Sequence, residues 1–430
     1  GRPSEAARRI ADRRFGPGVV AEARYVRGLA LVRAGSTAGA RAALQRVIAL
    51  NRETRWAADA MYLLADLESD AGRDAAARDL HQRACVHAQP GGFSDNACFR
   101  AGILNFALGR AANAATSFDA LPRRFPNSPE VIGALYWAGR SYERAGRDSL
   151  ARARWTAVLE REPLSFYAVQ SGRRLGTRPW TPSPSSLPRS AALETAMRRA
   201  AVLERLGMGT EERHEYDAIE RDAEAAPATA LEAGAAFLDR GEPVRAIRMG
   251  WRAVATGRAA EDSGRVMDER GYMLAYPMLS EADMIARSRA NNLDPALVAA
   301  VIRQESQWNP RALSVAGARG LMQVMPSVGE AIARSKGYPV WDPALLFDPH
   351  VSLDLGTAHL RAALSRYRDL PRALAAYNAG GSRVRRWAQR TGVEDPEIFI
   401  ERIPFVETRD YVRIVLRNAE LYRALYGLTR

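Results

Sequence analysis

The chain has 430 residues, which is more than one ordinary hydrophobic core accommodates and predicts two or three domains. Its content of 47% apolar and 26% charged residues is that of a folded globular protein, and no apolar run approaches the ~18 residues that a membrane-spanning helix requires. A net charge of +13 and a pI near 10.2 favour a polyanionic partner, such as nucleic acid, anionic lipid or an acidic cell-wall polymer.

The basic residues themselves argue against nucleic acid. Of the 62 basic side chains only Lys336 is a lysine, which is typical of a GC-rich coding bias rather than of a binding patch. The sequence has no basic block interleaved with aromatics, and no zinc-knuckle or RNA-binding sheet motif. We therefore expect no nucleic-acid partner. The sequence opens with GRPSEAARRI and not with a basic and apolar leader, so a secreted form needs a leader upstream of Gly1.

The first half of the chain carries an internal repeat. A glycine recurs every 37 residues, at Gly35, Gly72, Gly109 and Gly146. An alanine follows each glycine by five positions, a small residue precedes it by seven, and an aromatic residue precedes it by ten. These are Ala40, Ala77, Ala114 and Ala151; Gly28, Ala65, Gly102 and Gly139; and Tyr25, Tyr62, Phe99 and Tyr136.

This register predicts an array of helical hairpins. An aromatic and a small residue three positions apart share one helix face, where the small residue admits a neighbouring backbone. Glycine then turns the chain, and the alanine packs the second helix closely on the first. The pattern resembles tetratricopeptide-type repeats, with Pro126 and Pro163 ending the last two units, although its period is longer than is usual for that family. We expect an α-superhelix over residues 1–176.

The two cysteines of the chain, Cys85 and Cys98, lie within this array. A disulfide closing so short a loop would stabilise the fold by roughly 3 kcal/mol in an oxidising compartment. Two free buried thiols are the alternative, and spacing alone leaves both open.

A segment rich in proline and serine, TRPWTPSPSSLPRS at 177–190, interrupts the helical patterns. Helical periodicity resumes from Ala191 to about Gly257, and Gly234, Gly241 and Ala246 repeat the earlier spacing once more. We therefore predict a linker followed by a second helical array over 177–270, and a third domain over 271–430. Helical arrays alone would imply binding rather than catalysis.

The third domain contains a carboxylate on an apolar helix face. Asp294 and Pro295 begin a predicted helix as cap and first residue. Its apolar stripe consists of Leu297, Val298, Val301 and Ile302, and the next position on that face is Glu305. Partial desolvation would raise the pKa of this carboxyl, as a general acid at a glycosidic oxygen requires. From this helix alone, an ion pair between Glu305 and an arginine is the favoured interpretation.

Three downstream motifs change that balance. SVAGARGLMQVMPS, at 314–327, is a glycine-rich loop whose amide and thioether groups, from Met322, Gln323 and Met325, suit a sugar with hydroxyl and acetamido groups. LAAYNAGG places Tyr377 and Asn378 at a helix end. IPFVETRDYV offers Glu407 and Tyr411 one helical turn apart.

The order ESQWNPRALSVAGARGLMQVMP, AYNAGG, PFVETRDYV resembles the catalytic domain of the soluble lytic transglycosylases, a branch of the lysozyme-like superfamily. The motifs occur in that family's order and spacing over roughly 272–430, and the helical N-terminal region is similar to the superhelical part of its large members. The resemblance implies an all-α chain with a C-terminal lysozyme-like domain. One departure is Ser352 in DPHVSLDLG, where the family usually has asparagine, and which we expect to alter a local helix cap.

The resemblance implies that Glu305 is the single catalytic acid and base. It would protonate the oxygen between N-acetylmuramic acid and N-acetylglucosamine of peptidoglycan, then deprotonate the muramyl 6-hydroxyl, which closes a 1,6-anhydro ring without water. Tyr377 would lie near Glu305 and orient it. The positions that would line the sugar subsites are Ser314, Gln323, Met325, Tyr377, Asn378, Glu407 and Tyr411. The resemblance further implies a periplasmic monomer with a Cys85–Cys98 disulfide and with neither cofactor nor metal.

Two alternatives stay open at this point. A lysozyme-like muramidase would use water and a second carboxylate at a set separation. The candidates for that second group are Glu330, Asp348, Asp354 and Glu407. For the first three, solvent, arginine pairing or capping is the expected role, and Arg409 offers Glu407 a structural partner. The second alternative is a non-catalytic scaffold that binds peptidoglycan.

Overall fold

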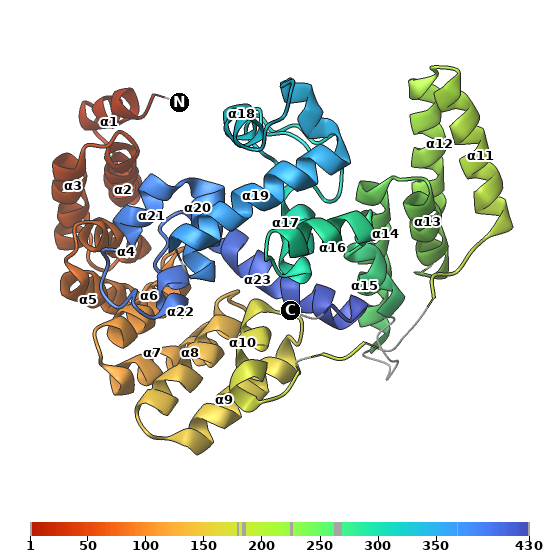
Figure 1. The fold of residues 1–430 in the computed structure, drawn as a ribbon. Coiled ribbons are helices and arrows are strands. Elements are labelled where there is room, and N and C mark those ends of the chain that lie inside the picture. Colours follow the sequence, from red (N-terminus) through yellow and green to blue (C-terminus); the bar gives the residue numbers. More distant parts are fainter. Residues whose placement is uncertain are drawn as a thin grey trace. The chain divides into compact units, whose positions relative to one another are not determined.

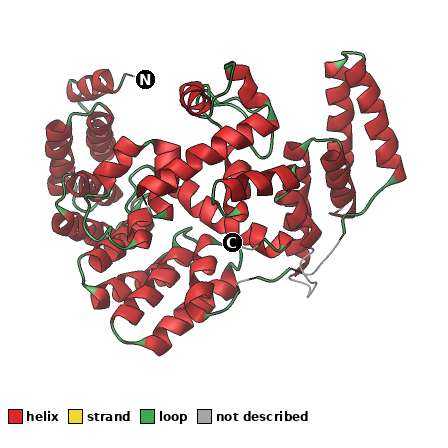
Figure 2. Ribbon diagram, in the orientation of Figure 1, coloured by secondary structure: helices red, strands yellow, loops and turns green. Residues whose placement is uncertain are grey.

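The structure is a computed structural model that describes residues 2–178, 180–182, 186–223, 227–261, 269–367 and 369–428. Over these ranges the chain forms helices joined by loops, with no strand (Figures 1 and 2). Two isolated bridges, which pair Leu313 with Arg319 and Arg319 with Val324, are the extended pairings found there. The all-α prediction is confirmed. None of the described helices combines the length and apolar character that crossing a bilayer demands.

The chain divides into two compact units, and each unit is made of two segments that are separate in the sequence. The first contains residues 1–179 and 381–409, and the second contains residues 180–380 and 410–430. The three-part division expected from the sequence, with boundaries after 176 and 270, is a different description and stays a prediction. Of the expected linker at 177–190, residues 179 and 183–185 lie outside the described residues, as do residues 224–226 and 262–268 of the expected second array.

The first unit is built from successive helical hairpins (Figure 1). Its helices are α1 (Pro3–Ala11), α2 (Pro17–Arg33), α3 (Thr37–Leu50), α4 (Arg55–Asp70), α5 (Asp74–Cys85), α6 (Ser94–Ala107), α7 (Ala111–Arg124), α8 (Val131–Arg144), α9 (Asp148–Arg161), α10 (Phe166–Leu175), α21 (Gly381–Trp387) and α22 (Pro396–Glu401). Each of the four marker glycines has a positive φ, between 69° and 77°, directly after a helix, where a side chain would be strained. The predicted hairpin register is confirmed.

The small residues of the repeat make room for side chains of the following helix. A Cβ on Gly102 would lie 2.4 Å from the Phe118 ring, and one on Gly139 would lie 2.3 Å from the Trp155 indole. The sequence predicted a neighbouring backbone at these positions, but the close neighbour is a large side chain. The aromatic side chain of the following helix therefore packs directly on the backbone of the preceding helix, at a position where only glycine leaves enough space. Cys85 at the end of α5 and Cys98 in α6 are joined by a disulfide within the same array.

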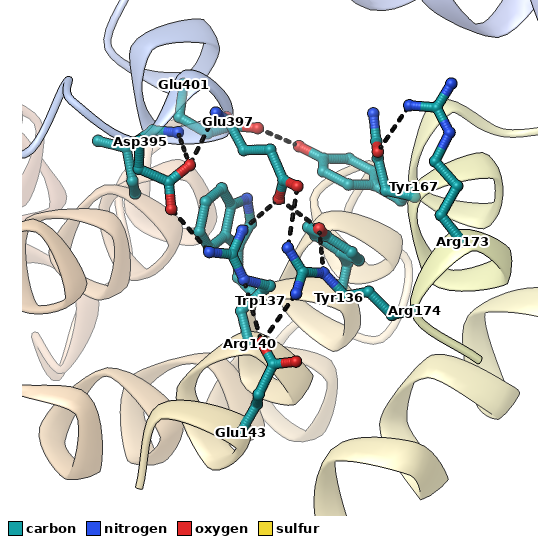
Figure 3. A network of polar contacts seen from close by, with 12 residues as sticks. Tyr136, Trp137, Arg140, Glu143, Tyr167, Arg173, Arg174, Asp395, Glu397 and Glu401 are labelled. Carbon is teal, nitrogen blue, oxygen red and sulfur yellow. Dashed lines mark hydrogen bonds and ion pairs between the residues drawn. The ribbon is translucent and has the colours of Figure 1, made fainter. Parts of the chain in front are cut away.

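Residues 381–409 are held in the first unit by a network of charged and hydroxyl groups (Figure 3). Glu397 accepts hydrogen bonds from Tyr136, Arg140 and Arg174. Arg140 also binds Asp395 at 2.6 Å. The Tyr167 hydroxyl donates to the Glu401 carboxylate at 2.9 Å. The acidic ends of α22 thus lie on basic and hydroxyl groups of α8 and α10, more than 200 positions away in the sequence.

One ion pair of this segment is almost wholly buried. The guanidinium of Arg402 and the carboxylate of Asp74 are bonded through both nitrogens, with Nη1 to Oδ2 at 2.8 Å, and their side chains are 3% and 4% exposed. Arg402 Nη1 also donates to the Thr391 carbonyl at 2.7 Å, and Ser69 Oγ lies 3.2 Å from Nη2. The donors around it lower the pKa of Asp74 despite its burial. Asp74 is therefore ionised, and the pair joins the repeats to the segment that precedes α23 (Val406–Tyr426).

The second unit contains the remaining helices and most of α23. They are α11 (Ala191–Arg205), α12 (Gly209–Asp222), α13 (Pro227–Asp239), α14 (Pro243–Glu261), α15 (Glu269–Ala275), α16 (Glu281–Ala290), α17 (Pro295–Glu305), α18 (Pro326–Ser335), the 3₁₀ helix η2 (Pro343–Phe347), α19 (Pro349–Tyr367) and α20 (Leu370–Ala379). Gly241 turns the chain between α13 and α14 with φ 79°, and Ala246 is fully buried behind it. The hairpin spacing predicted at these positions is present.

We expect Asp74→Asn to lower the free energy of unfolding by about 3–5 kcal/mol, because it leaves the Arg402 guanidinium buried without its counter-ion. Chemical denaturation monitored by circular dichroism measures this loss. The matched control is Asp70→Asn, which breaks the pair between Arg390 and Asp70, whose side chain is 59% exposed, and should cost under about 1 kcal/mol. Equal losses for the two variants would show that burial does not set the strength of the Asp74 pair.

Candidate active site

Glu305 is the last residue of α17 and lies entirely within the second unit. The Asp294 carboxylate caps the helix by accepting from the Ala296 amide at 3.0 Å, and Pro295 is its first residue, as predicted. The apolar stripe is buried, with Val298, Val301 and Ile302 at zero exposure. Glu305 itself is half-buried, so the helix delivers its carboxylate to the edge of the core rather than to open solvent.

The chain turns sharply immediately after Glu305. Gln307 and Trp308 both have positive φ, 54° and 65°, which is costly for residues with a Cβ. Trp308 is 1% exposed, and its indole donates to the Tyr422 hydroxyl at 2.8 Å, which in turn donates to the Pro277 carbonyl at 2.9 Å. A buried, hydrogen-bonded anchor therefore holds a strained turn and fixes where the helix ends.

Within the described ranges, the Glu305 carboxylate receives one hydrogen bond. The Tyr411 hydroxyl, from α23, donates to Oε1 at 2.7 Å. Burial raises the pKa of Glu305 to about 7, and the hydrogen bond from Tyr411 opposes that rise. In the described part of the chain no arginine, lysine or histidine forms an ion pair with Glu305. The ion-pair interpretation favoured by the helix alone is therefore wrong.

The second carboxylate oxygen, Oε2, is open. It has no protein partner in the described ranges, and it is not among the atoms buried there without a hydrogen bond. Glu305 is thus a carboxyl that is protonated through a large part of the neutral range and that presents one oxygen outward. That is the arrangement of a general acid.

Tyr377 in α20 lies close to Glu305 but does not bind it. Its hydroxyl donates to the Met322 carbonyl at 2.7 Å, while burial and the Glu305 charge raise the pKa of Tyr377 well above its ordinary value. The same two causes raise the pKa of Tyr411. Both tyrosines are therefore neutral hydroxyl donors. The sequence expected Tyr377 to orient the acid, whereas the direct hydrogen bond comes from Tyr411.

The glycine-rich loop is held by hydrogen bonds between its own residues. The Ser314 amide donates to the Ala318 carbonyl at 3.0 Å, and the Ser314 Oγ accepts from the Ala318 amide at 3.0 Å. Gln323 has φ 48°, and its side-chain amide donates to the Ala312 and Gly320 carbonyls at 3.0 and 2.9 Å. The Gln323 NH₂ group thus shapes the loop, and its carbonyl oxygen remains for a ligand.

The two methionines of the loop differ in exposure. Met325 is 40% exposed, but Met322 is fully buried against Gly356, where a Cβ would lie 2.5 Å from the Met322 sulfur. The expectation that the loop presents both thioethers outward is therefore wrong for Met322. Only Met325 is available to a ligand.

Ser352 is not at a helix cap, contrary to the sequence expectation. It is fully buried in the first turns of α19, where Met322 N lies 3.4 Å from its Oγ. A Cβ on Gly320 would lie 1.9 Å from the Leu346 carbonyl and 2.7 Å from Ser352 Oγ. Ser352 therefore supports the loop from beneath, at a point where only glycine and a small side chain fit.

The other carboxylates considered from the sequence have the structural roles expected for them. Asp348 caps α19 by accepting from the Val351 amide at 3.0 Å, and Glu330 pairs with Arg334 at 2.9 Å. Asp354 is bound by Arg287, Lys336 and Tyr338 at 2.6–3.0 Å, and these partners lower its pKa. None of the three is free to act as a second catalytic carboxylate.

The two remaining predicted site residues are Asn378 and Glu407. Asn378 is half-buried in α20, next to Tyr377 in the chain. Glu407 is exposed at the start of α23 and belongs to the first unit, whereas Glu305 belongs to the second. Arg409 is buried and donates to the Ile403 carbonyl at 3.0 Å.

One residue near the site was missed by sequence reasoning. The imidazole of His359, in α19, packs on the Tyr377 ring with centroids 4.8 Å apart. It lies in none of the motifs and is 18 positions from Tyr377, so only the packing of α19 on α20 brings the two rings together.

Comparison with known families agrees with this geometry. Residues 283–400 match the transglycosylase SLT domain, and residues 97–128 and 133–165 match the tetratricopeptide repeat. The protein thus contains a transglycosylase SLT domain combined with tetratricopeptide repeats in one all-α chain.

The chain is similar to soluble lytic murein transglycosylases. The chain is 36% identical over 171 residues to the soluble lytic murein transglycosylase of Salmonella typhimurium, and equally to that of Escherichia coli K12; each alignment covers 38% of this chain. The chain spans about a quarter, 26%, of the length of these curated relatives. The resemblance seen in the motifs is confirmed.

Two solved structures share the fold. An inactive mutant of the lytic transglycosylase Slt from Pseudomonas aeruginosa superposes with a TM-score of 0.74 at 22% identity, covering 100% of this chain and 67% of that one. The 70-kDa soluble lytic transglycosylase in complex with bulgecin A gives 0.74 at 19% identity, covering 99% and 66%. These TM-scores, over nearly all of this chain, show a likeness of fold that includes both the helical array and the C-terminal region.

We expect Tyr411→Phe to raise the pKa of Glu305 above its value of about 7, because the lost hydrogen bond stabilises the ionised carboxylate. Carbon-detected NMR titration of side-chain carboxyls measures the change. Tyr426→Phe, on the same helix, removes a hydroxyl that donates to the Tyr276 carbonyl and should leave the titration unchanged. A titration unaltered by Tyr411→Phe would contradict the assignment.

Glu305→Gln should stabilise the fold at alkaline pH and have little effect at pH 4. The folded-state pKa, about 7, lies above the ordinary 4.5, so the folded state holds a proton that the unfolded chain releases. The associated stability, about 3 kcal/mol, is complete below about pH 4.5 and is lost as pH rises to about 7. Denaturation at several pH values tests this. Glu330→Gln, at an exposed pair, should show no such pH dependence.

Proposed function

We propose that the protein is a peptidoglycan lytic transglycosylase that cleaves the β-1,4 bond between N-acetylmuramic acid and N-acetylglucosamine. The single observation that carries the proposal is the environment of Glu305: a half-buried carboxyl with a pKa of about 7, one neutral hydroxyl donor and one open oxygen. The SLT domain that contains it and the murein-acting relatives supply the substrate class.

The proposed reaction uses Glu305 twice. The protonated carboxyl donates its proton to the glycosidic oxygen as the bond from that oxygen to the muramyl anomeric carbon breaks. The resulting carboxylate takes the proton of the muramyl 6-hydroxyl, whose oxygen bonds to the anomeric carbon and closes the 1,6-anhydro ring. Glu305 is protonated again at the end, and no water is consumed. A pKa near 7 suits both steps, since the group must give and take a proton at one pH.

The neighbouring residues are proposed to hold the sugar and the acid. Tyr411 stabilises the carboxylate formed between the two proton transfers, through the hydrogen bond to Oε1. Tyr377 holds the loop at the Met322 carbonyl. Ser314, Gln323, Met325, Asn378 and Glu407 are the further proposed contacts with the glycan. Gln323 and Met325 have a free carbonyl oxygen and an exposed thioether to offer.

Peptidoglycan places the proposed activity outside the cytoplasm, and we propose the periplasm. The Cys85–Cys98 disulfide supports this, because such bonds persist in oxidising compartments. The net charge of +13 also suits a wall polymer whose peptide stems carry carboxylates.

Digestion of purified sacculi tests the reaction. The wild-type protein should release muropeptides with anhydro ends, lighter by one water than hydrolysed ends, as mass spectrometry resolves. Glu305→Gln should lower release by roughly 10²–10⁴-fold or more while sedimentation with sacculi is retained. Glu330→Gln, on the exposed pair with Arg334, should behave as wild type. Hydrolysed ends alone would identify a muramidase, and unchanged release by Glu305→Gln would overturn the assignment of the acid.

A further inference from the structure

His359 occupies an unusual position for a histidine in this chain. Its ring lies on the Tyr377 ring at 4.8 Å between centroids, with an angle of 41° between the planes. Tyr377 in turn holds the Met322 carbonyl of the glycine-rich loop and is close enough to Glu305 for the carboxylate charge to raise its pKa. The Tyr377 ring thus contacts His359 and also lies near the proposed acid, Glu305.

The nitrogens of this imidazole have no protein partner in the described ranges. His87, by contrast, contacts two carbonyls, and His350 contacts the Asp283 carboxylate. His359 is half-buried, and neither of its nitrogens is among the atoms buried without a hydrogen bond, so both reach solvent. Burial lowers the pKa of His359 below its ordinary value, so the ring is neutral near pH 7.

A neutral imidazole has one N–H donor and one nitrogen acceptor. A phenyl ring would fill the same space against Tyr377 without the cost of partly desolvating two polar atoms. What the imidazole adds is a donor and an acceptor that reach solvent next to the Tyr377 ring. Hydroxyl and acetamido groups of a sugar complement this pair, since they too both donate and accept.

We propose that His359 is a glycan-contact residue, whose neutral imidazole hydrogen-bonds a hydroxyl or acetamido group of the sugar bound next to Tyr377. This inference rests on the proposed function for its substrate class. It assigns His359 to binding and not to proton transfer, which remains with Glu305.

The first test is kinetic, on soluble uncross-linked glycan strands of alternating N-acetylglucosamine and N-acetylmuramic acid. His359→Phe keeps the ring and removes the nitrogens; KM should rise about tenfold, as expected for one lost hydrogen bond, with kcat within twofold. The pH at which kcat is half-maximal should stay unchanged. His359→Gln, which again supplies a donor and an acceptor, should recover most of the affinity. The matched control is His350→Phe, an exposed histidine of the same helix, which should behave as wild type.

The second test does not require catalysis. In the Glu305→Gln background, calorimetric binding of the same strands should weaken about tenfold on adding His359→Phe, with unchanged circular dichroism. Wild-type KM and unweakened binding would overturn the glycan contact. A lower kcat with a shifted pH midpoint at unchanged KM would also overturn it, because His359 would then act on Glu305 through Tyr377. If wild type made no anhydro product while the binding loss persisted, the proposed reaction would fail and the contact would stand.

Discussion

The chemistry of the second unit depends on one constraint: the Glu305 carboxylate is taken partly out of water and is compensated by a neutral hydroxyl instead of a cation. An arginine in place of Tyr411 would hold the carboxyl ionised and remove its capacity to donate a proton near pH 7. Much of the surrounding structure serves this arrangement. The buried stripe of α17 delivers the acid, the Trp308 anchor ends the helix just beyond it, and the loop is fixed through Tyr377, Gln323 and Ser352.

The first unit shows a different use of charge. Arg402 and Asp74 are both almost inaccessible, and Glu397 collects three donors from α8 and α10. Pairs of this kind gain little net stability, since desolvation offsets attraction, but they make a wrong register expensive. Helical repeats present many similar grooves, so apolar packing alone would specify poorly which one accepts residues 381–409. We infer that the ion pairs favour the observed register, because it brings Glu397 to Arg140 and Arg174 and Arg402 to Asp74.

Local features of this fold could be predicted from the sequence, and long-range ones could not. The helix ends at the four repeat glycines could be predicted, because a left-handed conformation after a helix depends on the residue at that single position. The Asp294 cap and the stripe leading to Glu305 were readable for the same reason. The packing of residues 381–409 against the repeats was not, since it joins segments about 200 to 330 positions apart. The hydrogen bond from Tyr411 to Glu305 was not predicted either, because spacing does not tell which of two tyrosines reaches the carboxylate.

The errors in the loop have a common physical origin. From residue type, Met322 was expected to offer a thioether to a ligand and Ser352 to alter a local helix cap, yet both side chains are fully buried. A glycine-rich loop that must keep Gly320 and Gln323 in left-handed conformations needs such a foundation, because the backbone would otherwise relax. In the sequence, residues that support a site by packing behind it cannot be distinguished by type from residues that contact its ligand. His359 is the converse case, since an ordinary position on α19 carries a polar ring whose nitrogens reach solvent next to Tyr377. Burial and hydrogen-bond partners, rather than residue type, therefore distinguish the residues that support the loop from those that can contact a ligand.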